Sequence, residues 1–279
     1  MTRRIAFVDV DGTLMGEWGV ISPIARAALA AARRAGHLVY ICTGRTEVEL
    51  AGLLGDVEYD GVVAACGGSI HIDGQPVWQS HFTPAALAAV LARSAAVGLT
   101  YYAETAQALV PSPTALAELD KLVSAYLAAD RPPAARRSLE AFLTWFQPGP
   151  LPRDDVYKVS FLGGHGLTVE ALQTAFAGVA NVVISTVKLF GPNCGELLQP
   201  GVNKASAMAW VLDHLGFDRR DSLAIGDSAN DLEMLDYAGV GIAMGNATPE
   251  VQAAADEVTA SVDEEGLAAA FQRHGLIAA

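Results

Sequence analysis

Short apolar runs alternate with amphipathic stretches along the first third of the chain. Residues 5–8 (IAFV), 38–42 (LVYIC) and 61–66 (GVVAAC) contain no charged position, which is typical of strands buried on both faces. The stretches between them, 23–35 and 47–54, carry apolar residues at helical spacing. The order strand, helix, strand, helix, strand predicts an α/β fold with a parallel sheet and crossover helices.

Capping residues sharpen the helix boundaries. Ser22 and Pro23 are of the types preferred at an N-cap and at the first helical position, and Gly36 is a typical helix end. Thr46 and Glu49 have the spacing of a capping box, so we expect a second helix to begin after Thr46.

The middle of the chain follows a different pattern. Thr83 and Pro84 open a helix, and strands and helices then come in mixed order between clusters of proline and glycine. We therefore predict an inserted α+β domain at 84–194, with 1–83 and 195–279 forming the α/β core. In the core, Asn203 is expected to cap a helix, and the run 222–227 (SLAIGD) is expected to be a strand.

Composition and charge narrow the classes of function. The chain has 279 residues, of which 52% are hydrophobic and 18% charged, and its net charge is −13. So acidic a chain repels nucleic acid and anionic membranes, and we expect neither as a partner. The three cysteines have no metal-site or disulfide spacing, and no apolar stretch reaches the length of a membrane span, so we expect a cytoplasmic protein. The oligomeric state is left open.

Polar side chains follow the apolar strands. Asp9 and Asp11 come directly after the first run, and in a strand residues two apart point to the same face. Two carboxylates held so close repel each other unless a cation lies beside them. The alternative is a simple turn at Asp11-Gly12 with Asp9 exposed.

The other core strands also end in polar or glycine residues. Thr43, Gly67-Gly68 and Asp227 occupy these positions. Ligands of open parallel sheets bind beyond the carboxyl ends of the strands, so we expect these residues to converge with Asp9.

Lys204 and Asp231 each allow two interpretations. Lys204 opens a helix, where the helix dipole disfavours a cation, so an anion bound nearby would explain it; a solvated lysine is the alternative. Asp231 could assist a metal site, or it could be the capping-box acid of Ser228, three residues earlier.

These residue types fit phosphate chemistry. Carboxylates suit Mg²⁺, whereas Thr43, the Gly44 backbone N–H and Lys204 suit a phosphate group. One carboxylate beside the metal can attack phosphorus, and a second can protonate the leaving oxygen and later activate water.

The chain resembles the haloacid dehalogenase superfamily, in particular its Cof-type sugar-phosphatase-like group with a large α/β cap. DVDGTL, CTGR, NKASAM and GDSANDLEML are similar to the four motifs of that family, in the same order. The resemblance covers nearly the whole chain and implies a Rossmann-like core with an inserted cap.

The resemblance also implies roles for individual residues. Asp9 would be the nucleophile and a Mg²⁺ ligand, and Asp11 would be the general acid/base whose backbone carbonyl also binds the metal. Thr43, Gly44, Lys204 and Asn230 would hold the phosphate. Asp227 would bind Mg²⁺ with Asp231 in support. The cap would select the substrate.

The sequence departs from the family pattern at two positions. Cys66-Gly67 stands where the family often has Asn-Gly, which leaves contacts near the cap hinge open. Ala205 replaces a glycine that often follows the motif lysine, and little effect is expected because alanine favours a helix.

The expected function is Mg²⁺-dependent hydrolysis of a small phosphorylated metabolite, most simply a sugar phosphate, through an aspartyl-phosphate. Because members of the superfamily that pump ions have threonine at the position of Asp11, the resemblance implies hydrolysis or transfer to a hydroxyl. The nearest alternative is a phosphomutase on the same core. A non-catalytic Mg²⁺/phosphate switch is a second alternative, although such switches lack an inserted domain and have another motif order. A degenerate family member that only binds a ligand is the third, and the complete motifs give it no support.

Overall fold

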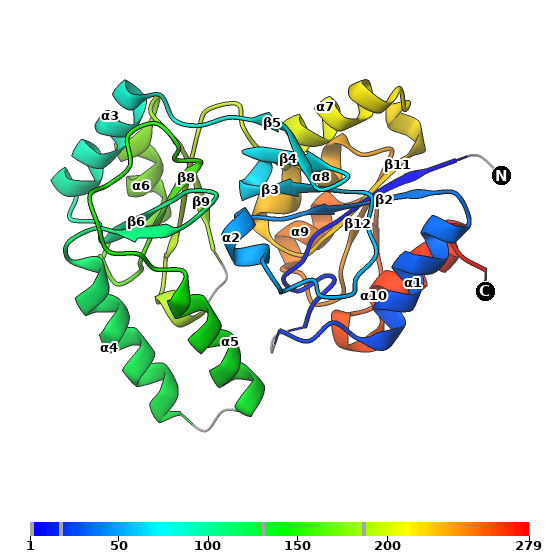
Figure 1. Ribbon diagram of the computed structural model, residues 1–279, viewed down its shortest axis with the longest axis horizontal. Helices are drawn as coiled ribbons and strands as arrows, with labels where there is room; N and C mark the ends of the chain where they lie inside the picture. The colour runs from blue at the N-terminus through cyan, green and yellow to red at the C-terminus, as the bar shows by residue number, and fades with distance from the viewer. Residues whose placement is uncertain (1–2, 17–18, 130–131, 186–187, 279) are drawn as a thin grey trace. The chain divides into compact units, whose positions relative to one another are not determined.

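The computed structural model describes residues 3–16, 19–129, 132–185 and 188–278 (Figure 1). The chain divides into two compact units. The first consists of Met1–Arg45, Gly52–Gln79 and Asn203–Ala279, and the second of Thr46–Ala51 and Ser80–Val202.

The first unit is built on a mixed sheet. Within the described residues it has eight strands in the order β13-β12-β11-β1-β2-β3-β4-β5. The strands are β1 (Ile5–Val8), β2 (Leu38–Cys42), β3 (Gly61–Ala64), β4 (Ser69–Ile72), β5 (Gln75–Gln79), β11 (Ser222–Gly226), β12 (Val240–Ala243) and β13 (Glu257–Val258). Pairing is parallel from β13 to β3, which confirms the predicted parallel core sheet.

The antiparallel hairpin β4–β5 at the edge of this sheet was not predicted. Its turn consists of Asp73 and Gly74, both with positive φ, at 51° and 73°. Asp-Gly is a strong hairpin signal, but the strands beside it are short and partly polar, which hid the pattern.

Helices cover both faces of the first sheet (Figure 1). On one side α1 (Pro23–Arg34) packs against α10 (Gly266–Arg273) and β2. On the other side α7 (Lys204–Leu215), α8 (Leu232–Tyr237) and α9 (Pro249–Ala254) share a buried cluster with Ile5 and Phe7. Because side chains alternate along a strand, Ala6 and Val8 face the opposite side. Both faces of β1 are therefore buried, which explains its uninterrupted apolar sequence.

The predicted caps are present. The Ser22 hydroxyl accepts a hydrogen bond from the Ala25 N–H, and Asn203 forms a capping box with Ser206. Helix α7 ends at Gly216 in the left-handed conformation, at φ 69°. The Thr46/Glu49 capping box also forms, but α2 (Glu47–Leu50) is shorter than expected because Ala51 leaves the helical region.

The second unit is a separate α+β layer structure. Its described strands form an antiparallel sheet in the order β7-β6-β8-β10-β9. They are β6 (Tyr101–Glu104), β7 (Leu109–Pro111), β8 (Lys158–Phe161), β9 (Asn181–Ile184) and β10 (Gly195–Leu198). The helices are α3 (Pro84–Ala96), α4 (Ala115–Ala128), α5 (Pro133–Thr144) and α6 (Val169–Phe176). Helices α3 and α6 pack on one face, whereas α4 and α5 pack around Tyr102 on the other.

The bounds of the second unit differ from the expected 84–194. Strand β10, which the sequence analysis placed in the core, pairs with β8 and β9, so the second unit continues to Val202. The unit also includes α2, where the Tyr157 hydroxyl donates to the Glu47 carboxylate at 3.1 Å. Strand pairing and side-chain contacts decide both differences, and neither can be read from local pattern.

Short 3₁₀ turns complete the described chain at Ala65–Gly67, Lys188–Phe190, Arg219–Asp221, Ala229–Asp231 and Val262–Glu264. The three cysteines are buried. Among the described residues, no helix combines the length and the apolar character that crossing a bilayer requires.

Candidate active site

The expected convergence at the strand ends is found in the first unit. Strands β11, β1, β2 and β3 lie side by side and run parallel. Asp227, Asp9, Thr43 and Cys66 follow their carboxyl ends, so they lie along one edge of the sheet. The site joins segments that are far apart in the chain, since Asp9 and Asp227 are separated by 218 positions.

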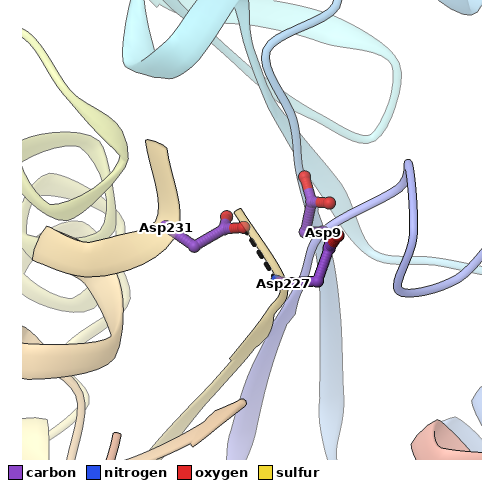
Figure 2. A group of neighbouring side chains, drawn as sticks. All are labelled: Asp9, Asp227 and Asp231. Atoms are coloured by element: carbon purple, nitrogen blue, oxygen red, sulfur yellow. Dashed lines mark hydrogen bonds between the residues drawn. The ribbon is translucent and has the colours of Figure 1, made fainter. Parts of the chain in front are cut away.

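Three carboxylates form the centre of the site. Asp9, Asp227 and Asp231 each offer an oxygen within 4.8 Å of the others (Figure 2). Asp9 and Asp231 are buried, with 4% and 0% of their surface exposed. Asp231 comes from the 3₁₀ turn before α8, which brings it back toward the end of β11.

Lys204 lies within this carboxylate cluster. Its side chain has no exposed surface, and Nζ donates to Asp9 Oδ1 at 2.7 Å and to Asp231 Oδ1 at 2.5 Å. The alternative of a solvated lysine is therefore wrong. Asn203 caps the helix that begins at Lys204, and this cap fixes the point where the lysine side chain leaves the backbone.

Asp231 has both of the properties that the sequence left open. It is the capping-box acid of Ser228, since its Oδ2 accepts from the Ser228 N–H at 2.9 Å. The same oxygen accepts from the Asp227 N–H at 3.0 Å (Figure 2). Its other oxygen binds Lys204. Asp231 thus holds both the lysine and the backbone of Asp227 in place.

The cluster contains more negative than positive charge. Burial raises the pKa of Asp9 well above its ordinary value, and Asp231 and Asp227 add to this effect although Lys204 opposes it. Burial and the Asp231 charge raise the pKa of Asp227 to about 7. Burial works against a charged Lys204, but Asp231 and Asp9 outweigh it and raise the pKa of the lysine. Three carboxylates and one ammonium leave an excess of negative charge that a divalent cation would neutralise, and carboxylate oxygens are the donors that Mg²⁺ prefers.

Gly12 and Thr13 contact Asp227, and sequence reasoning assigned neither a role. Gly12 has φ +88°, and a Cβ atom there would lie 2.3 Å from Asp227 Oδ2. The Thr13 hydroxyl donates to Asp227 Oδ1 at 3.3 Å. Their position directly after Asp11 was the available signal, because only a glycine allows this turn to approach a carboxylate.

The Asp11 carboxylate lies apart from the other three. Its side chain is 49% exposed, and Arg45 binds both of its oxygens, with Nε to Oδ2 and Nη2 to Oδ1 each at 2.7 Å. The strand ends at Val8 and the chain turns at Gly12, so the strand alternation that placed Asp9 and Asp11 on one face does not apply. Arg45 had no predicted role.

The expected phosphate residues line the same edge of the sheet. Thr43 is buried, and its hydroxyl accepts from the Arg45 N–H at 3.2 Å, with Gly44 between them in the loop after β2. The Asn230 side chain accepts from the Ser228 hydroxyl at 3.0 Å, and its Nδ2 lies 3.9 Å from the Cys66 sulfur. The unusual cysteine at position 66 therefore contacts an expected phosphate residue.

Comparison with known proteins gives a consistent result. The model of the haloacid dehalogenase-like hydrolases matches residues 6–271. The chain is 28% identical to the putative phosphatase YkrA of Bacillus subtilis over 99% of this chain and 100% of that protein. It is 30% identical to 5-amino-6-(5-phospho-D-ribitylamino)uracil phosphatase YwtE of the same organism, over 94% of each chain.

The solved structure of a sugar phosphatase of haloacid dehalogenase subclass IIB is 22% identical and superposes with a TM-score of 0.74, covering 98% of this chain and 100% of that one. This likeness supports the fold of core and inserted domain. The chain belongs to the haloacid dehalogenase-like hydrolases, in their Cof-type group, and is a phosphoric monoester hydrolase of that family.

Proposed function

We propose that the protein is a Mg²⁺-dependent phosphatase of small phosphorylated metabolites that works through an aspartyl-phosphate. The observation that carries the proposal is the buried Lys204 between Asp9 and Asp231, with Asp227 completing an acidic cluster at the strand ends. A lysine so placed can stabilise negative charge on a phosphoryl group next to Asp9.

Asp9 is the proposed nucleophile. Lys204 binds its Oδ1, so we assign the attack on phosphorus to Oδ2. As the bond to the leaving oxygen breaks, its electron pair stays on that oxygen and Asp11 supplies the proton. Asp11 then takes a proton from water, whose oxygen attacks phosphorus and releases phosphate from Asp9. Thr43, Gly44 and Asn230 are proposed to orient the phosphate.

The acidic cluster fits a resident Mg²⁺ ion. Asp9 and Asp227 would hold it together with the backbone carbonyl of Asp11, while Asp231 supports the site through Lys204 and the Asp227 backbone. When bound, Mg²⁺ would neutralise charge on the carboxylates and on the phosphate.

A sugar or sugar-alcohol phosphate is the proposed substrate class. One full-length relative is named for hydrolysis of a phosphoribityl compound, and one structural neighbour is named a sugar phosphatase. The inserted unit, expected as a cap at 84–194, is proposed to select among such esters.

The test is phosphate release from sugar phosphates, nucleotides and other phosphoesters, with Mg²⁺ or with EDTA. We expect Mg²⁺-dependent turnover that falls by at least about 10³-fold in Asp9→Asn, because the nucleophile is lost while a similar shape is kept. Circular dichroism and urea unfolding would establish that the variant is folded. Retained activity in folded Asp9→Asn would contradict the mechanism, and activity only with a bisphosphate activator would favour a phosphomutase.

A further inference from the structure

We propose that Arg45 is the positioning residue of Asp11: it fixes the orientation of the acid/base carboxyl group relative to the leaving oxygen. The inference rests on the proposed function, since it assigns a supporting group to the proton-transfer step. It concerns residues of the first unit only.

The backbone of Arg45 is anchored on both sides. Its N–H donates to the Thr43 hydroxyl at 3.2 Å, and its carbonyl accepts from the Ala65 N–H at 2.8 Å. Thr43 follows β2 and Ala65 follows β3, so two neighbouring strands fix the loop that carries the arginine. The guanidinium therefore starts from a defined point at the edge where the site is built.

The contact between Arg45 and Asp11 is bidentate. Two parallel N–H···O bonds of 2.7 Å fix the plane of the carboxylate as well as its position. Asp11 is about half exposed, and a side chain so exposed would otherwise exchange among rotamers. Exposed ion pairs contribute little to stability, so orientation of Asp11 is the better explanation of this pair.

Each of the two catalytic aspartates thus has its own cation. Lys204 binds Asp9, which attacks phosphorus, whereas Arg45 binds Asp11, which handles protons. When Asp11 is protonated, one oxygen carries the proton toward the leaving group and the other can still accept from Arg45. The arginine can therefore keep the group aimed through both protonation states.

Leaving-group dependence separates this role from a structural one. A sugar alkoxide needs a proton as it departs, whereas the nitrophenolate of p-nitrophenyl phosphate departs without one. First-turnover release of sugar and of nitrophenol should be measured by rapid quench in excess enzyme with Mg²⁺. Later turnovers are unsuitable because hydrolysis of the intermediate needs Asp11 for every ester.

We expect Arg45→Ala to slow first-turnover sugar release by about 10²-fold, at the lower end of what general acid catalysis contributes. Nitrophenol release should slow by less than about fivefold, and KM should change little. Arg45→Lys should restore part of the rate, since one hydrogen bond to Asp11 remains possible. Asp11→Ala should show the same preference for the nitrophenyl ester.

Arg220→Ala is the matched control. Arg220 also binds an exposed aspartate through two bonds, to Asp218 at 3.0 and 2.8 Å, and it precedes β11, at the opposite end of that strand from Asp227. Both esters should react at the wild-type rate in this variant.

The inference would be overturned if Arg45→Ala slowed first-turnover release equally for both esters. It would also be overturned if the variant raised KM and left kcat unchanged. Either result would indicate that Arg45 contacts the phosphate or the substrate instead. Wild-type protein that cleaves neither ester would contradict the proposed function itself.

Discussion

Two buried clusters in this protein have nearly the same composition and different settings. Each contains one lysine, 0% exposed in the first unit and 3% in the second, bound to two carboxylates. The first joins Lys204 to Asp9 and Asp231, and the second joins Lys158 to Glu104 and Glu196.

The backbone positions of the two clusters differ. In the first, the lysine starts a helix and the carboxylates follow or flank strand ends, where backbone N–H groups and a third carboxylate, Asp227, are also available. In the second, Glu104 and Lys158 are a cross-strand pair between β6 and β8, and Ser160 faces Glu196 in the same way. These side chains are neighbours on one face of a sheet.

The surroundings of the two clusters indicate which of them can bind a ligand. In the second cluster, Glu104 accepts from the Ser160 hydroxyl and pairs with Lys158 at 3.3 Å, and both of these partners are side chains of the neighbouring strand β8. In the first, Asp227 adds a third carboxylate, and one oxygen of each of Asp9, Asp227 and Asp231 lies within 4.8 Å of the others, a spacing that could hold a metal ion. We interpret the second cluster as structural and the first as a metal and phosphate site.

Replacing each lysine by methionine should give the largest effect that separates the clusters. Removing one partner of a buried ion pair costs about 3–5 kcal/mol. In EDTA, the free energy of unfolding should therefore fall by about that amount in both Lys204→Met and Lys158→Met, as measured by urea unfolding. Mg²⁺ should stabilise Lys158→Met as it stabilises wild type. Mg²⁺ should stabilise Lys204→Met more than it stabilises wild type, because carboxylates that have lost their lysine partner bind the cation more tightly.

The distinction between the two clusters would be contradicted if Mg²⁺ left the stability difference between Lys204→Met and wild type unchanged. It would also fail if Lys158→Met abolished first-turnover chemistry while its fold was retained.

The pH dependence of stability should have a Mg²⁺-sensitive and a Mg²⁺-insensitive part. Burial raises the pKa of Glu104 to about 8, as burial and Asp231 raise that of Asp227 to about 7. The folded state then binds more protons than the unfolded chain above about pH 4, so stability should fall as pH rises from about 4 through 8, by at most about 1.4 kcal/mol per pH unit and group.

Urea midpoints at pH 5.5 and 8.5 would measure this fall. Asp227→Asn and Glu104→Gln should each reduce it in EDTA. With saturating Mg²⁺, Glu104→Gln should still reduce the fall in stability between pH 5.5 and 8.5. Asp227→Asn should then have no effect on this fall, because the cation replaces protons at Asp227. An equal effect of both variants in Mg²⁺ would contradict the assignment of the metal to the first cluster.

Removing one hydroxyl from each cluster should give the smallest effects. Ser160→Ala should cost about 1–2 kcal/mol of stability, because a buried acceptor loses its donor, and should leave kcat unchanged. Thr13→Ala removes a donor to Asp227 and should raise the Mg²⁺ concentration for half-maximal activity by about two- to fivefold. An unchanged Mg²⁺ requirement in Thr13→Ala would separate Thr13 from the metal site.

Local sequence alone determined much of the first unit and of its site. Uncharged apolar runs specify strands buried on both faces, and Ser22, Asn203 and Gly216 mark helix ends, because these effects act within a few residues. The parallel order of the strands then brings their carboxyl ends together, which is why the strand pattern is enough to group Asp9, Thr43 and Asp227.

Tertiary structure decided the features that depend on distant partners. The pairing of β10 within the second sheet and the cluster around Lys158 arise from strand register, which no local pattern encodes. The burial of Lys204 and the capture of Asp11 by Arg45 depend on how the loops beyond the sheet fold back. Sequence specifies which groups reach an edge, but charge, burial and hydrogen bonding between distant segments decide which of them meet, because those energies exist only once the chain has packed.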